Sequence, residues 1–106
     1  MDRYSVEITD EAEAQLEEYL EYLLFELNSE QAYEAVRDDY YDTLERLTKI
    51  AGKITVSDKP NLTIRNLRAI FFNKHDYVIL YRLVGNVAEI IKIYHTLEDY
   101  ENKVQN

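Results

Sequence analysis

The sequence has no cysteine and no tryptophan, and it has only two glycines and one proline among its 106 residues. The absence of cysteine excludes disulfides, thiolate metal sites and a cysteine nucleophile. Two isolated glycines, Gly52 and Gly85, cannot form a glycine-rich phosphate-binding loop. No apolar run is long enough to cross a bilayer, and no basic stretch followed by an apolar one marks a signal peptide at the N-terminus. We therefore expect a cytoplasmic protein that does not associate with membranes.

Positive charge is also scarce, and it is unevenly distributed. The chain has 12 basic and 21 acidic residues, a net charge of −9. Residues 1–52 have 4 basic and 15 acidic residues, a net of −11, whereas residues 53–106 have 8 and 6, a net of +2. Neutralising phosphates requires lysine and arginine, so this balance argues against general nucleic-acid binding. A surface that meets an anionic partner must come from the C-terminal half.

The N-terminal half has the pattern of one strand and two helices. Alternating polar and apolar residues predict a short strand over residues 3–8, and Thr9-Asp10 can cap a helix that follows. Apolar residues then recur every three or four positions up to Leu27, which predicts an amphipathic helix. Asn28-Ser29 separates it from a second amphipathic helix that ends near Ala51. We expect Gly52 to stop that helix in a left-handed conformation and the two helices to form an antiparallel hairpin.

The C-terminal half has the pattern of a sheet. Residues 53–63 are predicted to form a loop, and three strands are predicted over residues 64–72, 76–84 and 87–95. Gly85-Asn86 is a tight-turn signal between the last two strands. A short terminal helix is predicted over residues 97–104. The chain of 106 residues fits a single domain.

These elements predict an α+β fold. An N-terminal strand and an antiparallel helical hairpin precede three strands, in the order β-α-α-β-β-β. The hairpin is expected to pack on one face of a mainly antiparallel four-stranded sheet. We expect the uncovered face to be the side on which another macromolecule docks.

Few residues suggest catalysis or metal binding. Asp38, Asp39 and Asp42 have no histidine at ligand spacing, so a solvated helix face is favoured over a metal site, and no metal or cofactor is expected. His75 is interpreted as a surface turn residue. His95 ends the last predicted strand, where it either projects into a groove as an acid or base or is satisfied by nearby backbone.

Several side chains are candidates for partner contact. Arg65 and Arg68 on the first strand of the predicted meander, and Arg82 on the second, provide guanidinium groups that can clamp a phosphate or carboxylate. Positions 65 and 68 face opposite sides of a regular strand, so they cannot line one site together. The alternative is that they are exposed strand charges that pair with acidic helices. Tyr94 and Tyr100 flank His95 and suit either a binding surface or, for Tyr94, core packing.

The arrangement resembles the RelE/ParE toxins of type II toxin–antitoxin systems, of the plasmid-stabilisation type, over roughly residues 4–104. The opening strand and Leu-rich helix are similar to the start of that family. The stronger resemblance lies in the order and spacing of four segments, which are Arg65-x-x-Arg68, Asp76-Tyr77-Val78-Ile79-Leu80-Tyr81-Arg82, Val87-x-x-Ile90-Ile91-Lys92-Ile93-Tyr94-His95, and Asp99-Tyr100.

The resemblance implies a growth-inhibiting toxin that is held inactive by a cognate antitoxin wrapped over its sheet and groove. ParE-like members bind DNA gyrase, and RelE-like members cut mRNA on the ribosome without metal. For a nuclease, the resemblance implies His95 as the acid or base, Glu45 as its carboxylate partner, and Arg65 or Arg68 as the phosphate clamp. An assembly as a homodimer or as a hetero-oligomer with the antitoxin is expected.

Departures from the RelE pattern favour the ParE-like interpretation. Val78 stands where RelE-type nucleases often have a catalytic arginine, and Thr96 stands where basic residues are common. The net charge of −9 opposes docking into ribosomal RNA. Three hypotheses remain open: a protein-directed toxin, a ribosome-dependent mRNA endonuclease, and an inactive toxin-like subunit that still binds the antitoxin. We expect the antitoxin to carry basic residues where it meets the acidic hairpin.

Overall fold

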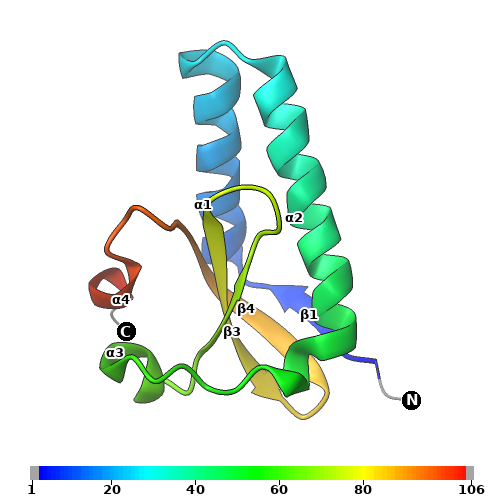
Figure 1. Cartoon of the computed structure of the whole chain (residues 1–106), viewed down its shortest axis with the longest axis vertical. Coiled ribbons are helices and arrows are strands. Elements are labelled where there is room, and N and C mark those ends of the chain that lie inside the picture. Colours follow the sequence, from blue (N-terminus) through cyan, green and yellow to red (C-terminus); the bar gives the residue numbers. More distant parts are fainter. Residues whose placement is uncertain (1–2, 105–106) are drawn as a thin grey trace.

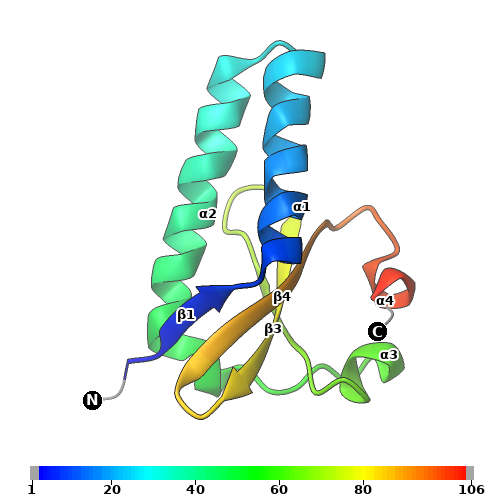
Figure 2. The same cartoon turned by 180° about the vertical axis from the view of Figure 1, so that it is seen from behind.

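The computed structural model describes residues 3–104 and shows the predicted α+β architecture (Figures 1 and 2). A four-stranded sheet lies against the lower part of a long helical hairpin, whose upper part extends beyond the sheet (Figure 1). The elements follow the predicted order, with additional short helical turns. They are β1 (Ser5–Ile8), α1 (Asp10–Glu21), η1 (Tyr22–Glu26), α2 (Glu30–Ile50), η2 (Ala51–Lys53), α3 (Pro60–Thr63), β2 (Arg68–Phe71), β3 (Tyr77–Val84), β4 (Val87–His95) and α4 (Tyr100–Lys103).

The sheet has the strand order β1-β4-β3-β2. Strands β2, β3 and β4 form an antiparallel meander, which confirms three neighbouring strands in this part of the chain. Gly85 has a φ of 62° in the turn between β3 and β4, a conformation that glycine adopts without steric cost. β1 pairs in parallel with β4, with Ser5 opposite Val87 and Ile8 opposite Ile90. A parallel pair needs a long connection, and the helical hairpin is part of it.

Both long helices begin where a hydroxyl side chain can accept a backbone hydrogen bond. Thr9 Oγ1 accepts from Ala12 N at 3.2 Å, and Ser29 Oγ accepts from Ala32 N at 3.1 Å, as their positions in the sequence predicted. The first helix does not continue regularly to Leu27, because its last turn is the π-helix η1. A wide turn of this kind changes the direction of side chains near the free end of the hairpin.

The sheet separates two hydrophobic cores. Tyr77, Ile79 and Tyr81 of β3 pack beneath the hairpin, and the alternate residues Val78 and Leu80 point to the opposite face. Residues beyond the sheet cover that opposite face, including Leu62, Leu67 and Val104. The opposite face is therefore not wholly uncovered as expected, because residues in and around α3 and α4 pack against part of it.

The segment before β2 is more ordered than the sequence predicted. Residues 53–63 were expected to form a loop, but they contain the end of η2 and the helical turn α3, which has Pro60 at its start. Proline suits the first helical position because its φ is already helical and no hydrogen bond is lost there. β2 begins at Arg68 instead of residue 64, after a turn in which Asn66 has a φ of 57°. The prediction that Arg65 lies on this strand was therefore wrong.

Gly52 follows α2 as predicted but for a different reason. Its backbone is not left-handed, since Gly85 is the only glycine with positive φ. A Cβ added at Gly52 would lie 2.0 Å from the Tyr4 hydroxyl oxygen. A side chain at position 52 would therefore have to displace the Tyr4 ring.

Candidate interaction site

A groove of about 570 Å³ lies where the upper part of the first helix meets the ends of β3 and β4. Its lining is mainly aromatic and aliphatic, with two carboxylates, and none of the described residues that line it is a lysine or an arginine. The groove is lined by the end of α1, by η1 and the residue after it, by the start of β3, by the end of β4 and by the segment that follows β4. The lining residues are Glu18, Tyr19, Tyr22, Leu23, Leu27, Tyr77, His95 and Glu98.

A hydrogen-bond network holds the floor of this groove. The Tyr19 hydroxyl donates to the Glu98 carboxylate, and the His95 backbone N–H donates to Glu98 Oε1 at 3.0 Å and to the Tyr19 oxygen at 3.2 Å. Lys103 Nζ contacts Glu98 Oε2 at 2.8 Å. Burial alone would raise the pKa of Glu98, but the bonds from Lys103, Tyr19 and His95 outweigh it and lower the pKa below its usual value. Glu98 therefore stays ionised and ties α1 to the segment after β4.

The Tyr19 phenol is correspondingly hard to ionise. Burial and the hydrogen bond to the Glu98 carboxylate raise the pKa of Tyr19 above its ordinary value. At neutral pH the hydroxyl therefore remains a donor. This keeps the network in one state rather than leaving a group free to exchange protons with a substrate.

His95 lies in the groove, as its position at the end of the last strand suggested. Its Nδ1 atom accepts a hydrogen bond from Leu97 N at 3.1 Å. Its ring packs edge-to-face on Tyr77 with a centroid distance of 5.0 Å. One ring nitrogen is thus satisfied by local backbone, and the ring forms part of an aromatic wall.

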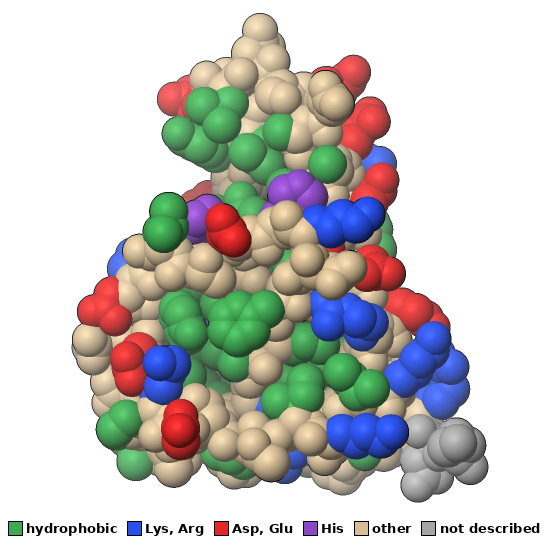
Figure 3. Space-filling view, in the orientation of Figure 1, with side chains coloured by type: hydrophobic (Ala, Val, Ile, Leu, Met, Phe, Trp, Pro, Cys, Tyr) green, Lys and Arg blue, Asp and Glu red, His purple; other side chains and the backbone are tan. Residues whose placement is uncertain are grey.

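The rim of the groove continues into an exposed apolar surface at the free end of the hairpin. Tyr22 is 53% exposed, Phe25 71% and Leu27 53%, and η1 has no buried residue. Figure 3 shows hydrophobic side chains as a green surface on the upper part of the molecule, above the two histidines. Clustered exposed aromatic and aliphatic side chains of this kind are typical of protein interfaces.

The other residues of the proposed nuclease set do not lie in this groove. Glu45 is on the exposed side of α2, where it pairs with Arg3 at 3.1 Å and Lys49 at 3.6 Å. Arg68 lies on β2 opposite Tyr81, and its Nη1 donates to the Ile54 carbonyl at 2.6 Å. These contacts place each side chain in a different part of the fold from His95, so the three are not brought together.

The remaining predicted contact residues are also engaged within the chain. Arg65 Nη1 donates to the Asn61 carbonyl at 2.7 Å, which closes the end of α3. Arg82 pairs across the strands with Glu89 at 2.9 Å. Tyr94 is buried in the core beneath α3 and α4, and its ring stacks on Tyr100 at 6.5 Å between centroids. Tyr94 and Tyr100 therefore lie on the face of the sheet opposite the hairpin.

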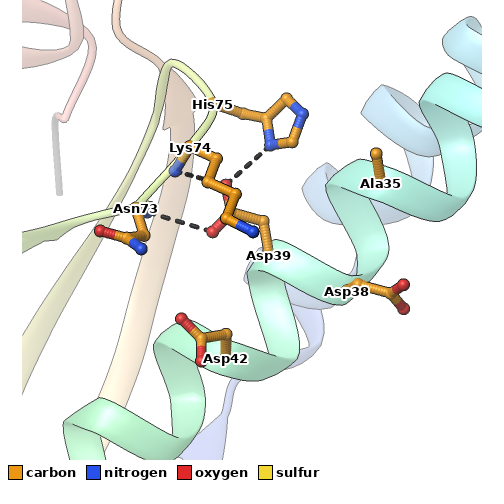
Figure 4. A pocket seen from close by; sticks show the side chains of 7 residues that line it. All are labelled: Ala35, Asp38, Asp39, Asp42, Asn73, Lys74 and His75. Atoms are coloured by element: carbon orange, nitrogen blue, oxygen red, sulfur yellow. Dashed lines mark hydrogen bonds and ion pairs between the residues drawn. The ribbon is translucent and has the colours of Figure 1, made fainter.

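Sequence reasoning missed a second polar cluster, which joins α2 to the turn before β3 (Figure 4). Asp39 is only 4% exposed, and its carboxylate accepts from Asn73 N at 3.1 Å, Lys74 N at 2.8 Å and His75 Nδ1 at 2.7 Å. The interpretation of Asp39 as part of a solvated helix face was wrong. His75 lies in the predicted turn and is partly exposed, and it also binds Asp39. Spacing could have indicated the burial of Asp39, because position 39 falls between Val36 and Thr43 on the buried stripe of the helix.

The lining of the groove indicates which kind of ligand it can bind. Within residues 3–104, no three histidine, aspartate or glutamate side chains are grouped so that they could hold a metal ion. No helix in this part of the chain has the length and apolar character needed to cross a membrane. The groove provides apolar contact area, aromatic rings and negative charge, which together suit a protein ligand with apolar and basic groups.

Comparisons with known proteins agree with this geometry. The family model described as the ParE toxin of the type II toxin–antitoxin system, parDE, matches residues 6–100. One solved structure that is similar in fold is described as the chromosomal ParDE toxin–antitoxin system from P. aeruginosa. It aligns with a TM-score of 0.69 and 20% identity, covering 88% of this chain and 96% of that one. No curated protein matches the chain in sequence.

Proposed function

The chain belongs to the ParE toxin family of type II toxin–antitoxin systems, and from this premise we propose that it inhibits growth by binding a protein target such as DNA gyrase. A cognate antitoxin neutralises it by covering the same surface, and both act in the cytoplasm. The binding surface in this proposal comprises the groove and the exposed hairpin end that forms its rim.

The composition of the groove is the observation that supports a protein target. Glu18 and Glu98 supply its charged groups, and no described lining residue is basic. A ribonuclease must neutralise the phosphate that it cleaves, and two carboxylates repel that phosphate. A protein ligand gains instead from the exposed Tyr22, Phe25 and Leu27, because burying apolar area favours association.

The positions of the charged residues also support a binding function. A metal-independent nuclease needs an acid or base, a carboxylate partner and a phosphate clamp around one scissile bond. Here His95 lies in the groove, while Glu45 and Arg68 form ion pairs or hydrogen bonds elsewhere. The mRNA endonuclease therefore remains the alternative, supported by the location of His95 alone.

Growth experiments separate the three hypotheses. A gyrase-directed toxin arrests growth on induction, damages DNA and leaves mRNA intact, and the purified chain inhibits supercoiling by gyrase. Codon-positioned cuts in mRNA that disappear in His95→Ala would replace this proposal with the nuclease. Unchanged growth would indicate an inactive subunit that retains only antitoxin binding.

A matched pair of variants tests the surface itself. Phe25→Ser removes the most exposed aromatic side chain of the hairpin end and is expected to weaken target binding by about 2 kcal/mol, roughly 30-fold, as for a hot-spot residue. Val84→Ser replaces another exposed apolar side chain, 58% exposed at the end of β3, and should leave binding and growth arrest intact. Equal effects of the two changes would argue against the hairpin end as the docking surface.

A further inference from the structure

We infer that the groove contains a cation-binding cup that takes an arginine side chain of the antitoxin, an inference that rests on the proposed function. The cup comprises the rings of Tyr19, Tyr22, Tyr77 and His95, with the Glu18 and Glu98 carboxylates at its side. The inference goes beyond general docking because it names the chemical group that the groove selects.

The aromatic rings of the cup are turned in different directions. Tyr19 and Tyr77 pack at 5.2 Å between centroids with an interplanar angle of 62°, and Tyr77 and His95 pack at 5.0 Å and 79°. These edge-to-face pairs turn successive rings in different directions, so the rings form walls instead of a flat stack. Aromatic walls attract a cation through the negative potential of the ring faces.

The cup also has negatively charged groups at its side. Glu98 is fixed by Tyr19 and His95 on one oxygen and by Lys103 on the other, while Glu18 lies exposed on α1. No described basic residue lines the groove itself, but Lys103 already pairs with Glu98, so the attraction for an incoming cation comes mainly from Glu18. A guanidinium suits this site better than an ammonium, because its flat surface stacks on rings while its edge donates to carboxylates.

The charge of the chain favours the antitoxin over a second copy as the source of this arginine. Residues 1–52, which form the hairpin, have a net charge of −11, so two copies facing each other here would repel. In the proposed function the antitoxin covers the surface that the toxin uses. A basic side chain in the cup provides both attraction and a fixed register for that segment.

The experiment measures which small cation the free chain binds. N-acetyl-arginine methylamide is titrated into the chain with isotope-labelled tyrosine, and the neutral isostere N-acetyl-citrulline methylamide is the control. The arginine probe should shift the ring resonances of Tyr19, Tyr22 and Tyr77, but not that of Tyr41, an exposed tyrosine outside the cup. The citrulline probe should bind more weakly by a factor of up to about 5, which is the effect expected for the loss of one cation–aromatic contact.

Two pairs of variants distinguish local contact from net charge. Glu18→Gln should weaken the arginine probe several-fold, whereas Glu17→Gln removes the same charge one residue away, outside the cup, and should have little effect. Tyr22→Leu should likewise weaken the probe, and Tyr41→Leu should not. Both tyrosines are more than half exposed, so neither change is expected to unfold the chain.

The complex with the antitoxin identifies the occupant. In the chain co-purified with its cognate antitoxin, the arginine probe should no longer shift the cup resonances. Equal binding of arginine and citrulline would overturn the cup, and continued probe binding in the complex would overturn the antitoxin as its occupant. Failure of the growth assays would refute the proposed toxicity without changing the probe result on the free chain, so the two failures are distinguishable.

Discussion

The two ends of the helical hairpin have the same amphipathic pattern in sequence but opposite environments. At the base, Leu47 and Ala51 are fully buried against the sheet. At the free end, Phe25 and Leu27 are largely exposed, and η1 buries no residue. The apolar spacing that predicts a helix therefore does not distinguish a core from a docking surface. The base provides stability, and the free end is available for binding.

The largest expected effect comes from replacing a leucine with alanine at each end of the hairpin. Leu47→Ala leaves a cavity in the core and should reduce the free energy of unfolding by about 2–5 kcal/mol. Leu27→Ala removes a side chain that is 53% exposed, and it should cost less than about 1 kcal/mol. Urea unfolding followed by circular dichroism measures both. Similar losses at the two ends would show that the free end also contributes core packing.

A second test concerns the polar cluster around Asp39, which joins α2 to the turn before β3. Asp39→Asn removes the charge that accepts hydrogen bonds from the backbone of Asn73 and Lys74 and from His75. We expect a loss of about 1–3 kcal/mol near neutral pH. Asp38→Asn is the control, because the Asp38 side chain is 73% exposed and should change stability by less than about 0.5 kcal/mol.

The same polar cluster should make the stability of the fold depend on pH in a predictable direction. Burial would raise the pKa of Asp39, but the hydrogen bonds from His75 and from the Lys74 and Asn73 backbone lower it below the ordinary value. A lowered folded-state pKa stabilises the fold fully above the unfolded-state pKa, and this contribution is lost as pH falls through the folded-state pKa. The difference between wild type and Asp39→Asn should therefore shrink in acid. Because Asp38, Asp42 and His75 line the same pocket, variants at those positions should be titrated in parallel.

The smallest expected effect comes from single hydroxyl groups. The Tyr81 hydroxyl donates to the Ala51 carbonyl at 2.7 Å inside the core, so Tyr81→Phe should cost about 1–2 kcal/mol. Tyr22→Phe at the free end should change stability by less than about 0.5 kcal/mol. Thermal unfolding of the two variants compares them directly. A larger loss of stability in Tyr22→Phe than in Tyr81→Phe would show that the free end, and not the base, contributes more to the stability of the fold.

Much of the fold followed from local sequence. The strand limits 87–95 and the helix caps Thr9 and Ser29 depend on alternation and on hydroxyl groups next to helix starts, which are local features. The segment before β2 was mispredicted because Pro60 begins a helical turn that is stabilised by packing of Leu62 beneath the sheet. That packing partner is distant in sequence, so spacing alone could not identify it.

The candidate site was less predictable than the fold. Two interpretations of His95 were left open, a side chain that projects into a groove and one that is satisfied by nearby backbone, and the structure shows features of both. Of the partners of His95, Glu98 is only three residues away in sequence, but Tyr19 comes from the first helix, and no local spacing connects Tyr19 with His95. Arg65 and Arg68 were interpreted either as clamps for a partner or as exposed strand charges that pair with the acidic helices. In the structure each binds a backbone carbonyl that only the folded chain places beside it.

The sequence by itself determined the elements, their order and the acidic charge of the hairpin, because periodicity, capping and composition are properties of neighbouring residues. Only the tertiary structure decided which apolar residues became core and which stayed exposed, since the sheet covers the hairpin along part of its length. It also decided that Asp39 would be buried and that four aromatic rings would share one groove. Those outcomes depend on contacts between residues far apart in the chain, which no local pattern encodes.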